Sequence, residues 1–378
     1  MARPPHGLSA LPPMFRYCMP RVRTQGHGLG NELVPWARAF LAARILDARL
    51  LPPAFGLNRR AYWQDFDTSP DDWIYHRAIE RMLPVIEFTE ADFIAHGGGS
   101  AVSALRSFAA AHRLRNRSVY VLVTEGLWGG YGHVAAAREF MRSTLYRSRY
   151  AAGNLLRLQQ RIDPRKVLVG MHVRLGDFVA PTSIGDYRRV ANASLPLDWF
   201  CKVADGLQER LGDDWQLLLV SDGGPERLRA LLEGYPCVTT GDMAHRDCSD
   251  ALALASADLL VCSASSYSSL AAFLSDAPYL CFAPSLFAHP EGCYSMHGDP
   301  PPSRPHCSPT PAAVRYFAQA RDAGRVSDAG SARGVAVEAD GRIPPATLER
   351  VLRRREARRW ELDLVCGGVT PIGSESGG

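Results

Sequence analysis

The sequence predicts an α/β fold that is divided into two domains. The chain has 378 residues, which is enough for two domains of ordinary size. Its second half alternates short apolar runs with segments of helical periodicity, and this alternation is typical of a parallel sheet covered by helices. In order, these segments are 167–173, 197–211, 216–221, 225–234, 258–263, 268–275 and 279–283. A hydrophobic fraction of 46% and a charged fraction of 22% agree with a globular protein of this class.

The first half opens with a predicted strand at 15–22, a glycine-rich turn and a helical pattern over 34–46. The turn contains Gly28, Gly30 and Asn31. Glycines let backbone N–H groups approach a phosphate, and the start of the helix adds positive potential. Asn31 can add a side-chain donor. The turn is therefore a candidate phosphate site, and the alternative is an ordinary connection between a strand and a helix.

A second strand of the first half is predicted at 119–124. It ends at Glu125, which opens a segment with two aromatic residues and four glycines. Ligands of α/β proteins sit beyond the carboxyl ends of the strands, so this segment is a candidate sugar-binding loop. The alternative is a glycine-rich surface turn with a solvated Glu125. Residues 134–162 are predicted to be helical and to carry the chain into the second domain.

The most informative segment is HVRLGD at 172–177, which closes the strand predicted at 167–173. His172 and Arg174 are two residues apart, so on a strand they point to the same face. The guanidinium of Arg174 can bind phosphate oxygens bidentately, and Asp177 can accept hydrogen bonds from backbone or from an arginine. The segment predicts a diphosphate site. The alternative is a structural ion pair between Arg174 and Asp177.

Five segments, taken in this order, resemble motifs of the GDP-fucose-dependent fucosyltransferases that make α1,2 and α1,6 links and of the protein O-fucosyltransferases. They are the turn at 28–33, the HVRLGD segment, LPLDWF at 195–200, Ser221–Asp222 and the strand–turn–helix pattern at 257–272. The chain departs from the usual motifs in two simple ways, because Leu175 replaces a second arginine and Gly223 replaces a second aspartate. The 264–270 segment also differs from the pattern of the α1,2 enzymes, so the sugar and the linkage stay open.

The resemblance implies the GT-B fold, in which two Rossmann-like domains face each other across a cleft. The acceptor domain is expected at 15–163 and the donor domain at 164–366, with a Pro/Gly-rich loop at 284–312. Residues 1–14 are expected to be flexible and residues 367–378 disordered. The implied activity is inverting, independent of metal and cofactor, and transfers fucose from GDP-fucose to a hydroxyl of an acceptor glycan or glycoconjugate. The alternatives are a GT-B transferase that uses another nucleotide sugar, and an inactive sugar-nucleotide-binding protein.

The resemblance also suggests roles for individual residues. Arg174 would neutralise the charge on the departing β-phosphate, and His172 would orient the pyrophosphate or the sugar. Asp222 would bind ribose or guanine. Glu125 and Asp177 are the two candidates for the base that takes the proton from the acceptor hydroxyl. The residues expected to bind the donor are Gly28, Gly30, Asn31, His172, Arg174, Ser221, Asp222, Ser265, Ser266 and Ser268.

Composition argues against several other classes of protein. A net charge of +4 is too small to indicate nucleic acid binding. No stretch approaches the roughly 20 apolar residues of a membrane span, and 1–13 lacks the apolar core of a signal peptide. Nine cysteines without a CxxC pair fit a reducing compartment. We therefore expect a cytoplasmic, bacterial enzyme, with peripheral membrane contact for a lipid-linked acceptor left open.

Two patterns that could suggest a metal are interpreted as metal-free. Asp65 and Asp67 form a D-x-D pattern, but no strand is predicted before them. A set of His and Cys residues in the Pro/Gly-rich loop matches no usual zinc spacing, and a loop over the cleft is the preferred interpretation. This set is His289, Cys293, His297, His306 and Cys307. The arginine-rich helical pattern at 344–365 is interleaved with glutamates and is interpreted as a solvated amphipathic helix.

Overall fold

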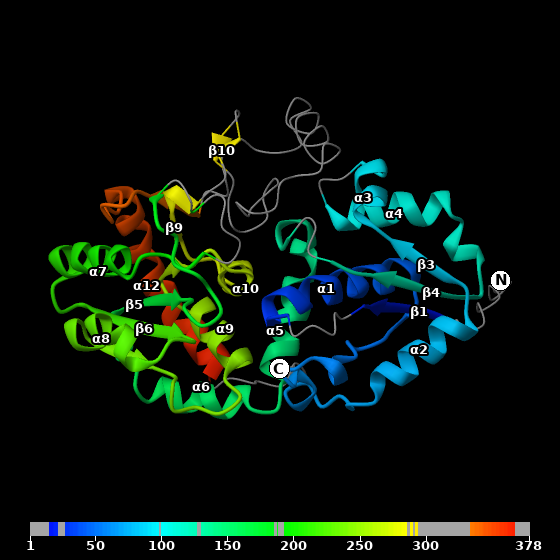
Figure 1. The fold of residues 1–378 in the computed structure, drawn as a ribbon, viewed down its shortest axis with the longest axis horizontal. Coiled ribbons are helices and arrows are strands. Elements are labelled where there is room, and N and C mark those ends of the chain that lie inside the picture. Colours follow the sequence, from blue (N-terminus) through cyan, green and yellow to red (C-terminus); the bar gives the residue numbers. More distant parts are fainter. Residues whose placement is uncertain are drawn as a thin grey trace, which may run out of the picture.

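The structure is a computed structural model that confirms an α/β protein with two parallel sheets (Figure 1). It describes residues 15–21, 27–97, 100–126, 130–184, 187, 193–285, 288–289, 292–293 and 333–366. The first sheet has the strand order β2-β1-β4-β3. Its strands are β1 (Phe15–Pro20), β2 (Arg49–Leu50), β3 (Val85–Phe88) and β4 (Val119–Thr124). The helices in this half are α1 (Leu29–Leu46), α2 (Asp72–Met82), α3 (Glu90–Ala95) and α4 (Ala101–Ala111).

The second sheet has the strand order β12-β9-β8-β5-β6-β7. Its strands are β5 (Val167–Val173), β6 (Trp215–Ser221), β7 (Cys237–Thr239), β8 (Leu259–Cys262), β9 (Tyr279–Phe282) and β12 (Gly334–Val337). The chain begins this sheet in the middle, builds outwards through β6 and β7, and then returns to the other side of β5 at β8. This order is that of a doubly wound nucleotide-binding sheet, and the order reverses between β5 and β8. Both sheets are consistent with Rossmann-like domains.

Helices cover the second sheet and connect its strands. They are α7 (Leu197–Leu211), α8 (Pro225–Gly234), α9 (Asp247–Ala255), α10 (Ser266–Leu274) and α12 (Pro345–Cys366), and α5 (Arg138–Tyr146) and α6 (Ala151–Gln159) precede β5. Short 3-10 helices lie at Phe55–Leu57, Tyr62–Gln64, Leu114–Asn116, Gly132–Ala137 and Ala283–Ser285, and a two-stranded ribbon pairs β10 (Ala288–His289) with β11 (Gly292–Cys293). Within the described ranges, no helix has both the length and the apolar character needed to cross a bilayer.

The buried strands explain why much of this order is predictable. All seven residues of β5 are buried, as expected of a central parallel strand that is covered by helices on both faces. The strands predicted at 119–124 and 167–173, and the helices predicted at 197–211 and 225–234, are confirmed with those bounds. The helical prediction for 134–162 corresponds to the 3-10 helix Gly132–Ala137, α5 and α6, with breaks in between. β7, α9 and β12 were not predicted.

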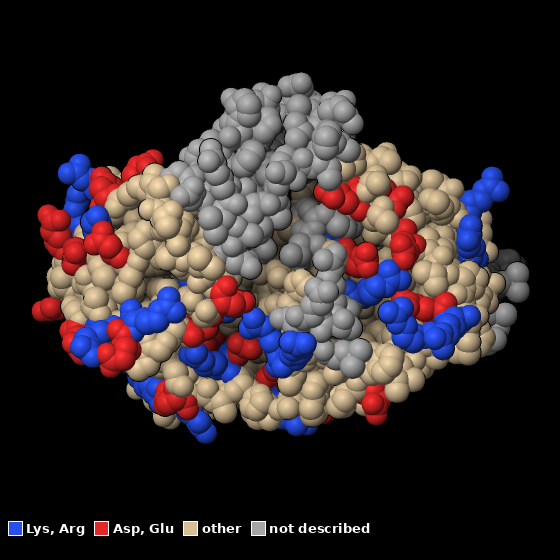
Figure 2. Space-filling view, in the orientation of Figure 1, with Lys and Arg blue, Asp and Glu red and all other residues tan. Residues whose placement is uncertain are grey.

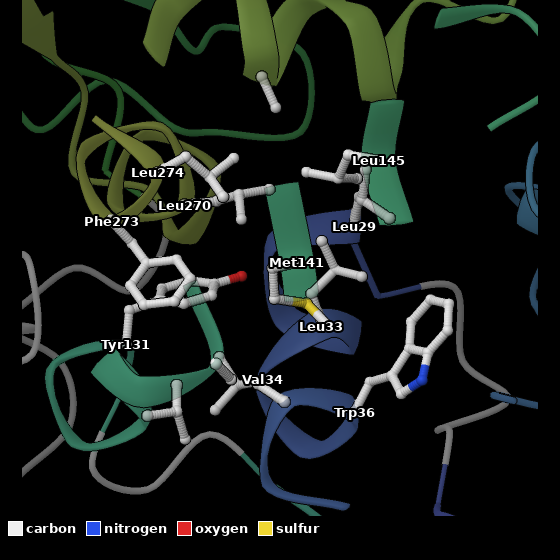
Figure 3. Close-up of a cluster of buried hydrophobic side chains, with 14 of the residues drawn as sticks. Leu29, Leu33, Val34, Trp36, Tyr131, Met141, Leu145, Leu270, Phe273 and Leu274 are labelled. Carbon is white, nitrogen blue, oxygen red and sulfur yellow. The ribbon is translucent and has the colours of Figure 1, made fainter. Parts of the chain in front are cut away.

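The two halves of the molecule share one apolar core. Figure 3 shows Leu29, Leu33 and Val34 of α1 close to Leu270 and Leu274 of α10, and all of them belong to the same buried cluster. In that cluster α5 contributes Met141 and Leu145, and the ring of Tyr131 stacks on Phe273 with centroids 4.9 Å apart. This apolar layer between the sheets fixes the position of the helix starts around the site.

Candidate functional site

A pocket of about 260 Å³ lies between the two halves of the molecule. It is located at the point where the strand order of the second sheet reverses, which is where ligands of doubly wound sheets bind. Residues expected to bind the donor line this pocket although they are far apart in the sequence. They are Gly28, Gly30, Asn31, His172, Arg174, Ser221, Asp222, Ser265 and Ser266. Asp177, one of the two candidate bases, lines the same pocket.

Serine hydroxyls join the strand ends that form the floor of the pocket. Ser263, just after β8, donates through Oγ to the carbonyl of His172 at 2.7 Å and accepts from the backbone N–H of Arg174 at 2.9 Å. The hydroxyl of Ser221 donates to the carbonyl of Val173 at 2.6 Å and accepts from the N–H of Gly223 at 2.9 Å. Ser221 therefore fixes the end of β5 through backbone contacts.

Arg174 is held by two carboxylates at the edge of the pocket. Its Nη1 is 2.8 Å from Oδ2 of Asp222, and its Nη2 donates to Oδ1 of Asp177 at 2.5 Å. The guanidinium carbon lies 5.2 Å from the centre of the Phe178 ring. The side chain is 16% exposed, and its buried Nε has no hydrogen-bond partner in the part of the chain that the structure describes. Arg174 and Asp177 thus form the ion pair that was the alternative to a diphosphate site. The Nε–H of Arg174 remains a buried donor without a partner among the described residues.

Asp222 is a rigid support for Arg174. Its Oδ1 accepts the N–H of Leu175 at 2.8 Å. Burial raises the pKa of Asp222, but the N–H groups of Leu175 and Gly176 and the charge of Arg174 outweigh burial and leave the pKa below its usual value. Gly176 is required here, because a Cβ at this position would lie 2.3 Å from Oδ2 of Asp222. Asp222 therefore stays ionised and positions the guanidinium.

His172 is a neutral imidazole beside this arginine. Burial, and then the nearby charge of Arg174, lower the pKa of His172 to about 3. Its Nδ1 is 2.7 Å from Oγ of Ser268, and its ring centroid is 5.1 Å from that of Tyr267. Ser268 is not part of the pocket lining and orients His172 from behind. His172 can therefore form a hydrogen bond with a ligand but does not supply a positive charge.

The starts of α1 and α10 meet at the pocket. Oγ of Ser265 caps α10 by accepting the N–H of Tyr267 at 3.2 Å, and Ser266 follows as the first helical residue. Gly30 of α1 packs directly on this turn, since a Cβ on Gly30 would lie 2.5 Å from the carbonyl carbon of Ser266. At Gly28 nothing lies within 4 Å of such a Cβ. Gly28 thus leaves open space, whereas Gly30 allows two helix starts, with their positive potential, to come together.

Glu125 lies outside the pocket, so the structure does not bring it together with Arg174. Its Oε2 is 3.2 Å from Nη1 of Arg21, and its side chain is 45% exposed. Arg21 also pairs with Glu80 at 2.9 Å and with Glu87 at 2.8 Å. Residues 127–129 of the glycine-rich loop predicted to follow Glu125 lie outside the described residues. Of the two candidate bases, the geometry places Asp177 at the site.

The sequence interpretation missed several charged residues that line the pocket, namely Arg60, Arg246, Asp247 and Asp250. Nη2 of Arg60 is 3.6 Å from Oδ2 of Asp177, and Nη2 of Arg246 donates to the carbonyl of Ser221 at 2.6 Å. The available signal was a pair of aspartates three residues apart at the start of an apolar helical segment, 247–255. That pattern places both carboxylates in the first turn of a helix.

Asp250 is the most unusual of these residues. It is only 3% exposed, and its Oδ1 has no hydrogen-bond partner among the described residues. Burial raises the pKa of Asp250 to about 7, although the charge of Arg246 and a hydrogen bond with Thr240 act in the opposite direction. Asp247 also lines the pocket, and burial raises the pKa of its carboxyl as well. A buried carboxyl with an unused oxygen in a pocket is a candidate for ligand recognition.

Asp65 and Asp67, the first pattern considered for a metal, are not among the described residues that line the pocket. Asp65 and Asp67 follow the 3-10 helix Tyr62–Gln64, and Nη2 of Arg149 pairs with Oδ1 of Asp67 at 2.9 Å. Of the second pattern, the described residues include His289 and Cys293, whereas 297, 306 and 307 lie outside them. The described part of the chain contains no group of three or more His, Cys, Asp or Glu residues arranged to hold a metal ion.

The pocket combines two helix starts, three arginines and a neutral histidine with the carboxyls of Asp247 and Asp250, whose pKa values are raised by burial. Such a site can bind an anion such as a diphosphate and, beside it, a group that donates hydrogen bonds. No known family model matches the sequence, and no curated protein matches it.

Proposed function

We propose that the protein is an inverting glycosyltransferase that moves fucose from GDP-fucose to a hydroxyl of an acceptor glycan, with the donor in the pocket described above. The observation that carries this proposal is the assembly of the predicted donor-binding segments on one pocket. The segments are 28–31, 172–177, 221–222 and 265–266, and they come from both halves of the chain. The two parallel sheets are what a GT-B arrangement requires.

The diphosphate is assigned to the side of the pocket where α1 and α10 begin. Helix starts attract anions through their unpaired N–H groups and the helix dipole, and the guanidinium group of Arg174 adds a full positive charge. In the reaction, the bond between the anomeric carbon and the β-phosphate oxygen breaks, and the acceptor oxygen attacks the opposite face. Negative charge then develops on the departing phosphate. Arg174 is the cation best placed to meet it, since Asp222 holds its guanidinium and the hydroxyl of Ser263 accepts from its backbone N–H.

The nucleobase is assigned to the side of Asp250. Guanine presents two neighbouring donors, N1–H and the 2-amino group, to which an ionised carboxylate is complementary. Uracil lacks the amino group, and adenine lacks the N1–H. Because Asp250 lines the pocket, its carboxylate favours a guanine nucleotide, and a buried polar group of this kind discriminates strongly when the partner is wrong.

We predict that GDP and GDP-fucose bind and that UDP and CDP do not. Calorimetric titration of the four ligands tests this directly. Tight UDP binding without GDP binding would assign the protein to another class of nucleotide-sugar enzyme.

Transfer should also continue in excess EDTA, because arginine and helix N–H groups stabilise the negative charge on the leaving phosphate. Restoration of a lost activity by Mn²⁺ would contradict the metal-independent mechanism.

A second prediction follows from the pKa of Asp250, which is about 7. Raised above its usual value, this carboxyl binds a proton as the pH falls through 7, and the protonated form no longer accepts both guanine donors. GDP affinity should therefore fall by about tenfold between about pH 8 and about pH 6. The Asp250→Asn variant should bind GDP more weakly and lose this part of the pH dependence. An identical pH dependence of GDP affinity in the wild type and the variant would show that Asp250 does not bind the nucleobase.

A specific observation favours one other function. Arg174 is already engaged by Asp177 and Asp222, as in a structural ion pair. A sugar-nucleotide-binding protein that performs no transfer would show GDP binding with neither transfer nor hydrolysis of the donor. The titration and the transfer assay together separate this alternative from the enzyme.

A further inference from the structure

The N-terminal half carries an apolar surface at the end of its sheet that is opposite the pocket. Met82, at the end of α2, is 71% exposed. Val85 at the start of β3 is also exposed, as are Phe15 and Val119, which are register partners at the starts of β1 and β4. Single exposed apolar side chains are ordinary, but a group at adjoining positions marks a binding surface.

Arginines surround this apolar group. Arg81 precedes Met82, Arg113, Arg115 and Arg117 precede Val119, and Arg49 starts the edge strand β2. All five are exposed, and none forms an ion pair with the residues that the structure describes. In Figure 2, basic side chains border the right-hand end of the molecule, close to where the chain enters β1. We call this combination the basic apolar surface.

Acidic residues of the same half do little to neutralise the basic apolar surface. Glu80 and Glu87 are paired with Arg21, towards the other end of the strands. Asp47 is exposed close to Arg49 and opposes part of the charge. The surface therefore keeps a net positive charge beside exposed Met, Val and Phe side chains.

We propose that the basic apolar surface docks the protein onto an anionic lipid bilayer. Apolar side chains on a helix and at strand ends can enter the boundary between headgroups and acyl chains, while arginines bind the anionic headgroups. A symmetric contact with a second copy would place arginines against arginines. The chemistry of the surface therefore fits a membrane better than a second copy.

The proposal also fixes an orientation. The strands β1 and β4 run from the basic apolar surface towards the pocket, and six extended residues span about 20 Å. A docked molecule would hold its pocket roughly that far from the bilayer, in the aqueous phase. This inference is independent of the identity of the ligand in the pocket, so it can fail or succeed without the proposed function.

Co-sedimentation with phosphatidylcholine vesicles, with and without phosphatidylglycerol, tests the charge contribution. The wild-type protein should bind only the anionic vesicles. Each arginine near an anionic surface contributes about fivefold in affinity, so the variant Arg81→Gln/Arg113→Gln/Arg117→Gln should bind about 100-fold more weakly. The control Arg157→Gln/Arg210→Gln/Arg353→Gln, on α6, α7 and α12, removes the same charge elsewhere and should bind like the wild type. Equal loss in both variants, or no vesicle binding at all, would overturn the proposal.

The apolar contribution is tested by Met82→Ser, which leaves the charge unchanged. The side chain of Met82 is 71% exposed, so the thermal unfolding temperature should be retained. Binding to anionic vesicles should fall at least about tenfold, whereas binding to heparin, a soluble polyanion, should not change. Unaltered vesicle binding in this variant would show that the surface is a general polyanion site and would contradict membrane docking. Conversion of a dimer into a monomer by this variant would show that a second copy occupies the surface.

Discussion

Replacing Arg174 with alanine is expected to reduce transfer from GDP-fucose at least about 100-fold, the usual effect of removing one pre-positioned donor from a developing negative charge. Arg174→Lys should restore little of the activity. A lysine ammonium is a point charge and cannot reproduce the planar fork with which Arg174 contacts Asp222 and Asp177 while presenting a further donor. The measurements are the rate of fucose transfer at saturating donor and the affinity for GDP in all three proteins.

A control is needed because Arg174 is also part of an ion-pair network. Arg227 donates to the carbonyl of Leu175 at 3.3 Å, so it supports the same strand end, but it does not line the pocket. Arg227→Ala should cost some thermal stability and leave transfer close to that of the wild type. Near-normal turnover in Arg174→Ala, with a lowered unfolding temperature like that of Arg227→Ala, would identify Arg174 as a structural residue only.

The second large effect is expected at Asp177. If its carboxylate takes the proton of the acceptor hydroxyl, Asp177→Asn should reduce the chemical step by roughly 10²–10⁴-fold and leave GDP affinity nearly intact. Asparagine keeps an oxygen that can accept from Arg174, so the position of the guanidinium is retained.

Glu125→Gln is the matched control for Asp177→Asn, because both exchanges remove one carboxylate and keep its shape. Glu125 lies outside the pocket lining and pairs with Arg21, so this variant should retain most of the activity. A large loss in Glu125→Gln with normal Asp177→Asn would reverse the assignment of the base. If neither variant is slowed, the acceptor is activated without a side-chain base.

The parts of the fold that the sequence predicted well are those in which local pattern and burial agree. The fully apolar run of β5 and the amphipathic pattern of α7 have this property. In contrast, α9 is buried on nearly all sides and so lacks the one-sided periodicity by which a helix is recognised. β7 has three residues after a proline, and β3 is largely exposed.

The same reasons explain which site residues were found. Arg174 and Asp222 follow strongly predicted strands, so their position at the carboxyl edge of the sheet could be anticipated. Asp250 lies on α9 and was missed together with that helix. Glu125 was expected to point into the cleft because β4 ends there, but its carboxylate pairs with Arg21, a residue more than a hundred positions away. Such a contact leaves no trace in a local pattern.

The apolar core shared by α1, α5 and α10 determines how the protein unfolds. If the chain were separated near residue 163, Leu29 and Leu33 of one part and Leu270 and Leu274 of the other would be exposed to water. Fully burying a side chain of this size stabilises a fold by about 1.5–3 kcal/mol, so the loss would be a large share of a typical net stability. The two sheets therefore unfold as one cooperative unit rather than as independently melting modules, and the pocket at their junction persists for as long as the whole fold does.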